Sequence, residues 1–389
     1  MHVVFINRYF HPDHSATSQM LSDLAFHLAA AGWDVEVITS RQHYDDARAA
    51  LPARESVRGV RVHRVWSTRF GRNFLPGRAI DYLSFYAAAF FGLLVRVRRD
   101  SVVVALTDPP LISVVAASTV RLRRATLINW TQDLFPEVAI ALGMWAPWPL
   151  RQLRNWSLHT ARTNVVLGER MRERLLLLGV SDVQVQHNWA HAGLRPISAD
   201  QNSLRRQWFP SDPFVVSYSG NLGRAHEVAT MAGAIRELRD DHGIAFLFVG
   251  GGAQLQSIHD AGGETVRFEP YQPMERLSES LSTADVHIVT LRSEMEGLIV
   301  PSKFYGILAV GRPVLFVGAA DGEIAKLIET IGCGAVIAEG DVRGLASWIR
   351  DFASDRPKAA AMGERGRREY ERHFAPEVAL RNWEDILHG

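Results

Sequence analysis

The pattern that most constrains the fold of this chain is an alternation of short apolar runs with amphipathic helical segments. The first run leads through a polar loop into a helical pattern at residues 18–31, which ends at Gly32. The apolar runs of this half lie at 2–6, 35–39, 60–65, 102–106 and 125–130. Strands that alternate with helices are typical of a parallel sheet covered by helices. The first half therefore predicts a Rossmann-like α/β domain.

The same alternation starts again near residue 213. A run at 214–219 leads into a glycine-containing turn at 220–223. Further runs lie at 245–249, 266–268, 286–290, 314–317 and 335–337. The segment at 190–212 holds Pro196 and Pro210 and is the natural linker. The sequence thus predicts two Rossmann-like domains, at 1–195 and 212–374, that face each other across a ligand-binding cleft.

Composition narrows the class of protein. The 389 residues carry 43 Lys plus Arg against 42 Asp plus Glu, and a net charge of +1 does not favour a nucleic-acid partner. The single cysteine, Cys333, excludes an intrachain disulfide, and the absence of CxxC and HExxH motifs leads us to expect no metal or other cofactor. Residues 1–6 lack the basic head and long apolar stretch of a signal peptide, which predicts a cytoplasmic protein.

Four stretches carry a family resemblance. In chain order they are Tyr9-Phe10-His11-Pro12 with Ala16-Thr17 beyond it, Gln132-Asp133-Leu134-Phe135-Pro136-Glu137, Tyr218 to Glu227, and Val300 to Gly306 with its continuation Gly311-Arg312-Pro313-Val314. Together they resemble the retaining GT-B glycosyltransferases of family 4, most of all the bacterial surface-polysaccharide enzymes of the N-acetylfucosamine-transferase-like branch. The resemblance implies a nucleotide-sugar donor in the second domain, an acceptor in the first, and a final helix at 375–389 that packs back on the first domain.

The diphosphate of such a donor leaves with growing negative charge, which helix N-termini and fixed cations can stabilise without a metal. The strand at 214–219 ends at Gly220 and Asn221, where glycine lets the backbone approach a ligand. Arg224 follows with a forked cation. We predict that these residues bind the diphosphate; a plain glycine turn with a solvated arginine is the alternative.

A second phosphate site is predicted at Pro301, Ser302 and Lys303. Pro301 and Ser302 are good residues for the start of a helix, which we expect at 302–310. A lysine at the positive end of a helix dipole is unfavourable unless an anion lies there. We therefore predict that Lys303, together with Arg224, stabilises the leaving group in catalysis.

The ribose and the base need further partners. The family usually holds the ribose with a glutamate on this helix, but the matching residue here is Gly306, for which we expect a close-packing reason. The candidate carboxylates are Glu294, Glu296 and Glu323, the last of which follows Gly322. Tyr271, in a loop with two prolines, is expected to stack on the base, and Gly250 to approach the nucleoside. Surface glutamates and simple turns are the alternatives.

In the first domain, the helix that begins near Ser18 is expected to point N–H groups at the diphosphate, although the family often has glycine there. Gln132 and Asp133 follow the strand at 125–130, at the carboxyl edge where such sheets bind ligands. We expect Asp133 to contact the acceptor hydroxyl or the transferred sugar as a catalytic residue. Gln132 and His14 are further acceptor candidates, and a turn-capping role is the alternative for Asp133.

Two segments, at 64–99 and 145–156, combine arginine with aromatic residues. The arginines of the first segment are Arg64, Arg69, Arg72, Arg78, Arg96, Arg98 and Arg99. The apolar run at 82–95 is, by our prediction, too short to span a bilayer. The pattern favours peripheral contact with anionic lipid, with a core helix and snorkelling arginines as the alternative.

These features predict a metal-independent glycosyltransferase that moves a sugar from a nucleotide-diphosphate donor, with UDP favoured by analogy, to a lipid-linked or saccharide acceptor at the cytoplasmic membrane face. The family implies retention of configuration and a role in surface polysaccharide or lipopolysaccharide synthesis. Two alternatives stay open: an epimerase-like enzyme that acts on nucleotide sugars, and a non-catalytic sugar-nucleotide-binding subunit, which Gly306 suggests. The sequence does not predict an oligomeric state.

Overall fold

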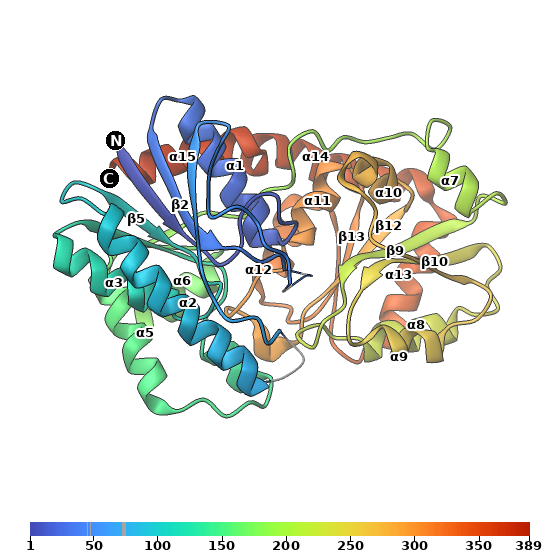
Figure 1. Cartoon of the computed structure of the whole chain (residues 1–389). Helices are drawn as coiled ribbons and strands as arrows, with labels where there is room; N and C mark the ends of the chain where they lie inside the picture. Colours follow the sequence, from blue (N-terminus) through green and yellow to red (C-terminus); the bar gives the residue numbers. More distant parts are fainter. Residues whose placement is uncertain (45, 47, 72–74) are drawn as a thin grey trace. The chain divides into compact units, whose positions relative to one another are not determined.

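A computed structural model describes all residues from Met1 to Gly389 except 45, 47 and 72–74. The chain divides into two compact units, each built on its own sheet (Figure 1). The N-terminal unit comprises Met1–His187 and Leu380–Gly389, and the C-terminal unit comprises Asn188–Ala379. Each sheet is Rossmann-like and almost wholly parallel, which confirms the α/β prediction.

The N-terminal unit has a sheet of strand order β3-β4-β2-β1-β5-β6-β7-β8, in which only the β3–β4 pair is antiparallel among the described pairs. Its strands are β1 His2–Ile6, β2 Asp34–Ser40, β3 Arg54–Val57, β4 Val60–Val65, β5 Val102–Ala105, β6 Thr126–Thr131, β7 Thr163–Val166 and β8 Val183–Val185. Its helices are α1 Ala16–Ala30, α2 Leu75–Arg96, α3 Ile112–Arg123, α4 Glu137–Ala141, α5 Trp148–Thr160 and α6 Glu169–Leu177. Successive strands leave β1 in opposite directions, so the sheet has its switch point between β1 and β5.

The last helix, α15 Pro376–His388, packs on the N-terminal unit through its residues from Leu380 onward. Trp383 is fully buried, and its ring centroid lies 4.5 Å from that of Trp130 on β6. Glu384 Oε1 lies 2.6 Å from His27 Nε2 on α1. Arg162 Nη2 donates to the carbonyl oxygen of Ile386 at 2.8 Å. Burial of one apolar face thus attaches this segment to a sheet formed almost 200 residues earlier in the chain.

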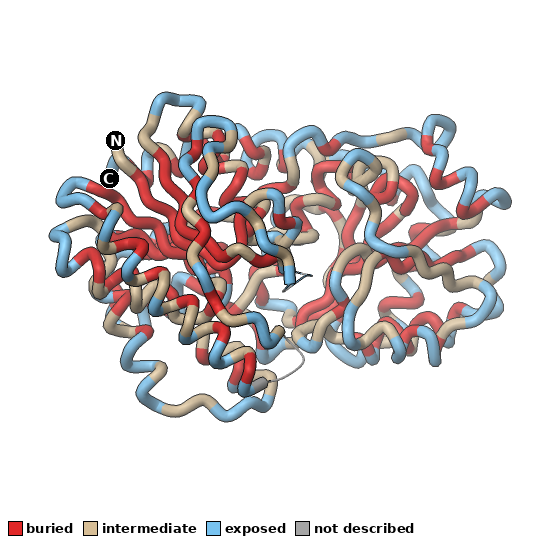
Figure 2. The backbone as a smooth tube through the Cα atoms, viewed as in Figure 1, coloured by how far each residue is buried: buried red, intermediate tan, exposed pale blue. Residues whose placement is uncertain are grey.

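The C-terminal unit has an all-parallel sheet of order β11-β10-β9-β12-β13-β14. Its strands are β9 Phe214–Asn221, β10 Ile244–Gly251, β11 Val266–Glu269, β12 Val286–Thr290, β13 Val314–Val317 and β14 Gly334–Ile337. Its helices are α7 Ser203–Trp208, α8 Ala229–Glu237, α9 Leu255–Ala261, η1 Met274–Arg276, α10 Leu277–Ser282, η2 Ser293–Met295, α11 Lys303–Ala309, α12 Glu323–Ile331, α13 Val342–Ser354, α14 Arg356–Glu369 and the π-turn η3 Tyr370–Phe374. Both sheets are buried under their helices (Figure 2), and here the switch point lies between β9 and β12.

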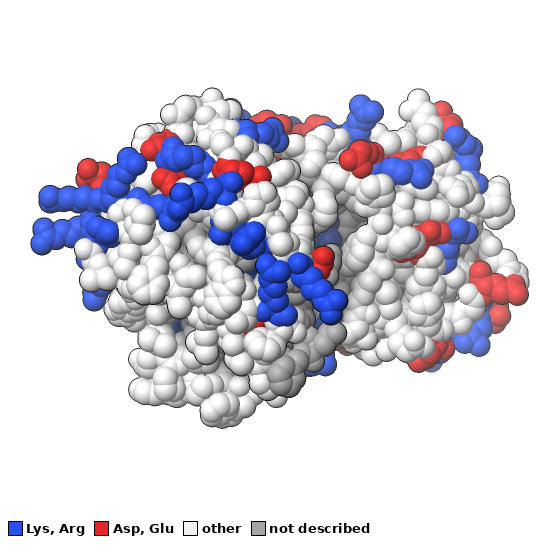
Figure 3. All heavy atoms as spheres, in the orientation of Figure 1, with Lys and Arg blue, Asp and Glu red and all other residues white. Residues whose placement is uncertain are grey.

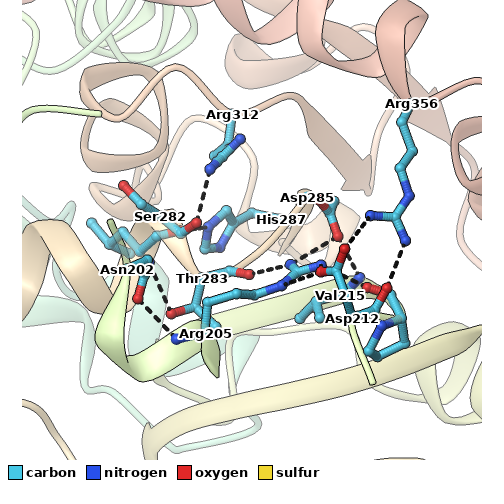
Figure 4. Close-up of polar contacts among 12 residues, drawn as sticks. Asn202, Arg205, Asp212, Val215, Ser282, Thr283, Asp285, His287, Arg312 and Arg356 are labelled. Atoms are coloured by element: carbon cyan, nitrogen blue, oxygen red, sulfur yellow. Dashed lines mark hydrogen bonds and ion pairs between the residues drawn. The ribbon is translucent and has the colours of Figure 1, made fainter. Parts of the chain in front are cut away.

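A buried arginine fixes the beginning of β9. Arg205 on α7 is 5% exposed, and its Nη1 donates to the Thr283 carbonyl at 2.6 Å and to Asp285 Oδ2 at 2.9 Å. Its Nη2 donates to Asp212 Oδ1 at 2.7 Å, while Asp285 Oδ2 also accepts from the Val215 N–H at 2.7 Å (Figure 4). A buried guanidinium that satisfies two carboxylates and a carbonyl ties α7 to the starts of β9 and β12, and so helps to fix where β9 begins.

The helix α2 corrects one prediction. It covers 22 residues, and the part from Pro76 to Arg96 is long and apolar enough, by length and composition alone, to cross a membrane. The prediction that this run is too short to span was therefore wrong. About 28% of its most apolar window is buried, and Phe85, Ala89 and Leu93 form part of the core beside the sheet. The helix is thus amphipathic, with one face in the core.

Candidate functional site

In the C-terminal unit, two glycines bring the ends of β9 and β10 together. Gly220 and Gly250 are paired in the parallel ladder, and their φ angles are 117° and 125°. A Cβ atom on Gly250 would lie 2.6 Å from the Gly220 carbonyl oxygen and 3.0 Å from Tyr271 Cε1. Since L-residues rarely adopt such φ angles and no side chain fits there, the conformation requires glycine. The carboxyl edge next to the switch point is therefore lined by bare backbone.

The Lys303 side chain lies against this edge. A Cβ atom on Gly220 would lie 3.8 Å from Lys303 Nζ, which donates a hydrogen bond to the Tyr218 hydroxyl and lies 3.9 Å from the centre of the Tyr218 ring. Burial lowers the pKa of Lys303 to about 7, and no carboxylate contributes to the shift. An ammonium group held this way, without a carboxylate to compensate it, is suited to an anionic ligand.

A histidine missed by the sequence analysis lies beside Lys303. His226 Nδ1 lies 2.7 Å from the Thr290 carbonyl, so this nitrogen carries the proton. Burial, followed by the nearby Lys303 charge, lowers the pKa of His226 to about 3. The ring is therefore neutral at physiological pH, and its Nε2 is an acceptor. His226 lies in the quoted stretch 218–227, but nothing in its spacing distinguished it from a loop residue.

The other donor residues predicted for this edge are exposed. Tyr271 is 61% exposed, and its ring lies over Gly250 and Gly251, at 3.5 Å from a Cβ on the latter. It is placed as an open platform beside the glycine turn. Asn221 and Arg224 are also exposed. The Arg224 cation is thus accessible to an anionic ligand.

The candidate ribose carboxylates lie together at the start of α12. Glu296 Oε1 accepts from the Glu323 backbone N–H at 2.8 Å, and a Cβ on Gly322 would lie 2.6 Å from Glu296 Oε2. Glu323 is 6% exposed, whereas Glu294 is exposed and pairs with Arg292 at 3.2 Å. The structure therefore brings Glu296, Gly322 and Glu323 together and leaves Glu294 outside this group.

The helix α11 begins at Lys303, one residue later than predicted, with Ser302 as its N-cap and Pro301 buried before it. A Cβ on Gly306 would meet Leu281 Cδ1 at 3.7 Å and Leu194 Cδ1 at 4.0 Å, which is ordinary contact. The expected close-packing reason for Gly306 was therefore wrong. Position 306 faces the apolar side chains of Leu281 and Leu194.

In the N-terminal unit, two carboxyl groups lie near the ends of β5 and β6. Gln132 is buried directly after β6, and Asp133 beside it keeps an exposed surface. The protein packed around Asp133, and then the nearby charge of Asp108, raise its pKa to about 6. Asp133 still reaches solvent, which weakens the effect of burial on its pKa, but the Asp108 carboxylate raises this pKa independently of burial. A carboxylate with a raised pKa is a stronger proton acceptor.

Ser18 and His14 lie in a different setting. The helix α1 begins at Ala16, two residues before the predicted start, so Ser18 is inside its first turn. Ser18 is fully buried, and its hydroxyl donates to the Asp13 carbonyl at 3.1 Å, which holds the loop before the helix. His14 is exposed on that loop, and its carbonyl accepts from Gln19 Nε2 at 3.0 Å. The Ser18 side chain is thus used for loop structure.

Within the described part of the chain, no group of three or more His, Cys, Asp or Glu side chains is placed to hold a metal ion. The described side chains around Lys303 and around Asp133 form two groups that can act on a ligand directly. One set offers a cation, backbone N–H groups and an aromatic platform. The other offers a basic carboxylate, which suits a hydroxyl-bearing substrate.

Comparisons with known proteins identify the family. Residues 16–189 match the family described as "Glycosyl transferase 4-like domain", and residues 200–369 match "Glycosyl transferases group 1". The probable glycosyltransferase WbjE of Pseudomonas aeruginosa is 29% identical over 304 residues, 73% of this chain and 74% of that one. The putative colanic acid biosynthesis glycosyl transferase WcaI of Escherichia coli K12 is 26% identical over 408 residues, 98% of each chain.

Solved structures share the fold at low identity. Sucrose-phosphate synthase from Thermosynechococcus elongatus has a TM-score of 0.79 and 17% identity, and covers 99% of this chain and 98% of its own. Anabaena HepE in complex with UDP-glucose has a TM-score of 0.75 and 16% identity, covering 100% and 99%. The lipopolysaccharide glycosyltransferase WaaG has a TM-score of 0.70 and 15% identity, covering 100% of both chains. The chain is thus a GT-B glycosyltransferase of group 1, family 4, distantly homologous to WbjE and WcaI.

Proposed function

We propose that this enzyme transfers a sugar from a UDP-sugar to a lipid-linked acceptor at the inner face of the plasma membrane, with retention of configuration, in surface polysaccharide synthesis. The observation that carries the donor half is Lys303, whose ammonium group lies against the bare backbone of Gly220 and pairs with no carboxylate of the described residues. A diphosphate supplies the missing negative charge. The relative WcaI supports the setting, since it is named for colanic acid biosynthesis.

The choice of UDP rests on structural relatives. HepE is described in complexes with UDP and with UDP-glucose, and it aligns with this chain over its full length. In this proposal the diphosphate binds Lys303 and the exposed Arg224, while Tyr271 stacks on the base and Glu296 or Glu323 holds the ribose. Lys303 and Arg224 stabilise the charge that develops as the bond between the sugar and the diphosphate breaks.

On the acceptor side, Asp133 is proposed to accept a hydrogen bond from the attacking hydroxyl. That hydroxyl oxygen forms the new bond to the anomeric carbon as the diphosphate leaves from the same face. The proton passes to the diphosphate oxygen in a retaining reaction of this kind. Asp133 orients the hydroxyl and polarises its O–H bond, a role that suits its raised pKa.

Membrane contact is proposed through α2 and the segment 145–156. Leu83, Phe91 and Val95 on α2 are 65%, 66% and 79% exposed, and Trp145 and Trp148 are 86% and 68% exposed. On the face shown in Figure 3, the described residues over α2 and α5 are mostly uncharged, and Lys and Arg side chains gather beside them. An apolar surface flanked by cations fits an anionic bilayer surface. Arg72, part of this prediction, lies outside the described residues.

Calorimetric titration tests the donor assignment. We expect UDP to bind the wild-type enzyme more tightly than GDP or ADP, and Lys303→Ala to weaken UDP binding at least tenfold. Lys326→Ala, an exposed lysine on α12, is the matched control and should bind UDP normally. Equal UDP binding in Lys303→Ala and the wild type would overturn the assignment.

A further inference from the structure

A second arginine lies at the switch point of the N-terminal sheet. Arg8 lies two residues beyond the end of β1, and its backbone N–H donates to the carbonyl of Asp108, beyond β5, at 2.6 Å. This bond joins the two strand ends between which α/β sheets of this kind bind ligands. Arg8 is 5% exposed, so its guanidinium group is almost wholly removed from water. Its position makes Arg8 a candidate for binding a ligand, provided that its hydrogen-bond partners leave the guanidinium group incompletely satisfied.

The partners of Arg8 leave part of its charge and one donor unsatisfied. Arg8 Nη2 donates to Gln42 Oε1 at 3.0 Å, and the nearest carboxylate oxygen, Asp81 Oδ2, lies 4.0 Å away. The Asp81 carboxylate already accepts hydrogen bonds from Thr68 Oγ1 at 2.6 Å and from the N–H groups of Phe70 and Gly71 at 3.0 Å.

Arg8 Nε is buried and has no partner among the residues that the structure describes. A buried guanidinium group that lacks a partner for one donor, and whose nearest carboxylate is engaged elsewhere, costs free energy unless a ligand completes it.

The face of α2 that meets Arg8 carries a second cation. The guanidinium carbon of Arg8 lies 5.1 Å from the centre of the Tyr82 ring, and that of Arg78 lies 5.6 Å from the same ring. Residues 78, 82 and 86 follow one another at helical spacing, and the Tyr82 and Tyr86 rings are 6.4 Å apart. Tyr82 and Arg78 are only partly buried, so this stripe connects the buried Arg8 with the surface of the helix.

We propose that Arg8 and Arg78 bind the diphosphate group of a polyprenyl-diphosphate-linked acceptor, an inference that rests on the proposed function. Two guanidinium groups around one ring match a ligand with two adjacent phosphates, because each guanidinium can donate two hydrogen bonds to phosphate oxygens.

Next to the stripe, α2 exposes apolar side chains such as Leu83, which is 65% exposed and, in this proposal, contacts the prenyl chain. Asp133 follows β6, two strand spacings from β1, about 10 Å away along the same edge. The sugar hydroxyl of such an acceptor therefore reaches Asp133 while its diphosphate is held at Arg8.

The test uses geranyl diphosphate as the probe, in calorimetric titration of the full-length enzyme, with geraniol as the uncharged control. We expect geranyl diphosphate to bind and geraniol to bind at least tenfold more weakly. Arg8→Gln should weaken geranyl diphosphate binding at least tenfold and Arg78→Gln about threefold to tenfold. Arg121→Gln is the control for Arg78→Gln, because the guanidinium carbon of Arg121 also lies 5.6 Å from the centre of an aromatic ring, that of Trp156. This variant should leave geranyl diphosphate binding unchanged.

Two further arms separate this site from the donor site. Lys303→Ala should still bind geranyl diphosphate, and Arg8→Gln should still bind UDP. Loss of geranyl diphosphate binding in Lys303→Ala, with normal binding in the Arg8 and Arg78 variants, would show that the probe occupies the donor site and would overturn the proposal.

If Arg8→Gln does not fold, as judged by circular dichroism, the proposal is tested with two other variants. These are Arg78→Gln, at a partly buried position, and the conservative Arg8→Lys. Unchanged binding in both of them contradicts the proposal. Failure of UDP to bind the wild type would instead contradict the proposed function.

Discussion

The two units place their functional side chains at equivalent points of their sheets but build them differently. At the β9–β12 switch point, Gly220 and Gly250 expose the backbone, and Lys303 lies directly against it. At the β1–β5 switch point, the strand ends carry Arg8 and Asp108, and Asp133 follows on β6. The edge at β9 and β12 thus exposes bare backbone. The edge at β1 and β5 instead carries charged side chains, and their interactions affect their pKa values.

This difference predicts different responses to substitution. An edge formed by bare backbone should lose ligand binding at every pH when a side chain is added to it, because the backbone conformation is lost. An edge of titratable groups keeps its shape when one group is changed but loses its dependence on pH. The comparison also separates the substrates: a diphosphate needs close N–H groups and a cation, whereas a hydroxyl needs an acceptor for its proton.

The largest expected effect is that of Lys303→Ala on turnover. Removal of the cation that faces the leaving diphosphate should lower kcat about 10²–10³-fold, by analogy with loss of one group that stabilises transition-state charge. Transfer from a radiolabelled UDP-sugar to membrane lipid measures this. Lys326→Ala serves as the control, and a Lys303→Ala enzyme with turnover near normal would remove the cation from the mechanism.

Gly250→Ala should break the backbone edge. The new Cβ would lie 2.6 Å from the Gly220 carbonyl at a φ of 125°, so we expect a loss of about 2–3 kcal/mol in the free energy of unfolding, with weaker UDP binding. Gly263→Ala is the control, since its Cβ meets nothing within 4 Å. Urea unfolding measures both variants. Equal stability of the two would mean that the edge tolerates side chains after all.

Asp133 should give the other edge its pH dependence. Because its pKa is raised, the carboxylate becomes protonated at a higher pH than an ordinary aspartate as the pH falls, so kcat/KM should drop on the acid side of neutrality. Asp133→Asn should lower kcat/KM about tenfold or more at pH 8 and remove this acid limb. Asp100→Asn, exposed in the same unit, should keep the wild-type profile. An unchanged acid limb in Asp133→Asn would assign it to another group.

The smallest effect is expected at the membrane face. Phe91→Ser removes an apolar side chain, 66% exposed, from α2 and should lower binding to vesicles that contain anionic lipid severalfold. Leu177→Ser on α6 changes a side chain that is 87% exposed and should leave binding unaltered. Vesicle sedimentation compares the two, and equal losses would place the membrane contact elsewhere.

The sequence carries much of the fold and part of the site. Lys303 could be predicted because a lysine after Pro301 and Ser302 conflicts with the helix dipole, a conflict visible in a local pattern. The close-packing reason expected for Gly306 was wrong because the sequence does not show which face of α11 meets Leu281 and Leu194. The span length of α2 was underestimated because the predicted apolar run began after Asp81, whereas the helix continues through Asp81 and Arg78.

Other residues could not be predicted because they depend on contacts between distant segments. Arg205 is a core residue only because Thr283 and Asp285 lie beside it. Arg8 is set apart by its weak pairing with Asp81, more than 70 residues away, and by the ring of Tyr82. His226 is kept neutral by burial beside Lys303, which follows it by more than 70 residues. Spacing along the chain contains none of these relations.

The central claim is that the Lys303 ammonium group receives the donor diphosphate, and proton uptake on UDP binding tests it most directly. Burial holds the pKa of Lys303 near 7 in the free enzyme, so at pH 8 most of this group is neutral, and a bound diphosphate raises its pKa. Titration of UDP at pH 8 in buffers of different ionisation enthalpy should therefore show uptake of a large fraction of one proton, absent in Lys303→Arg. UDP binding without proton uptake in the wild type would contradict the account.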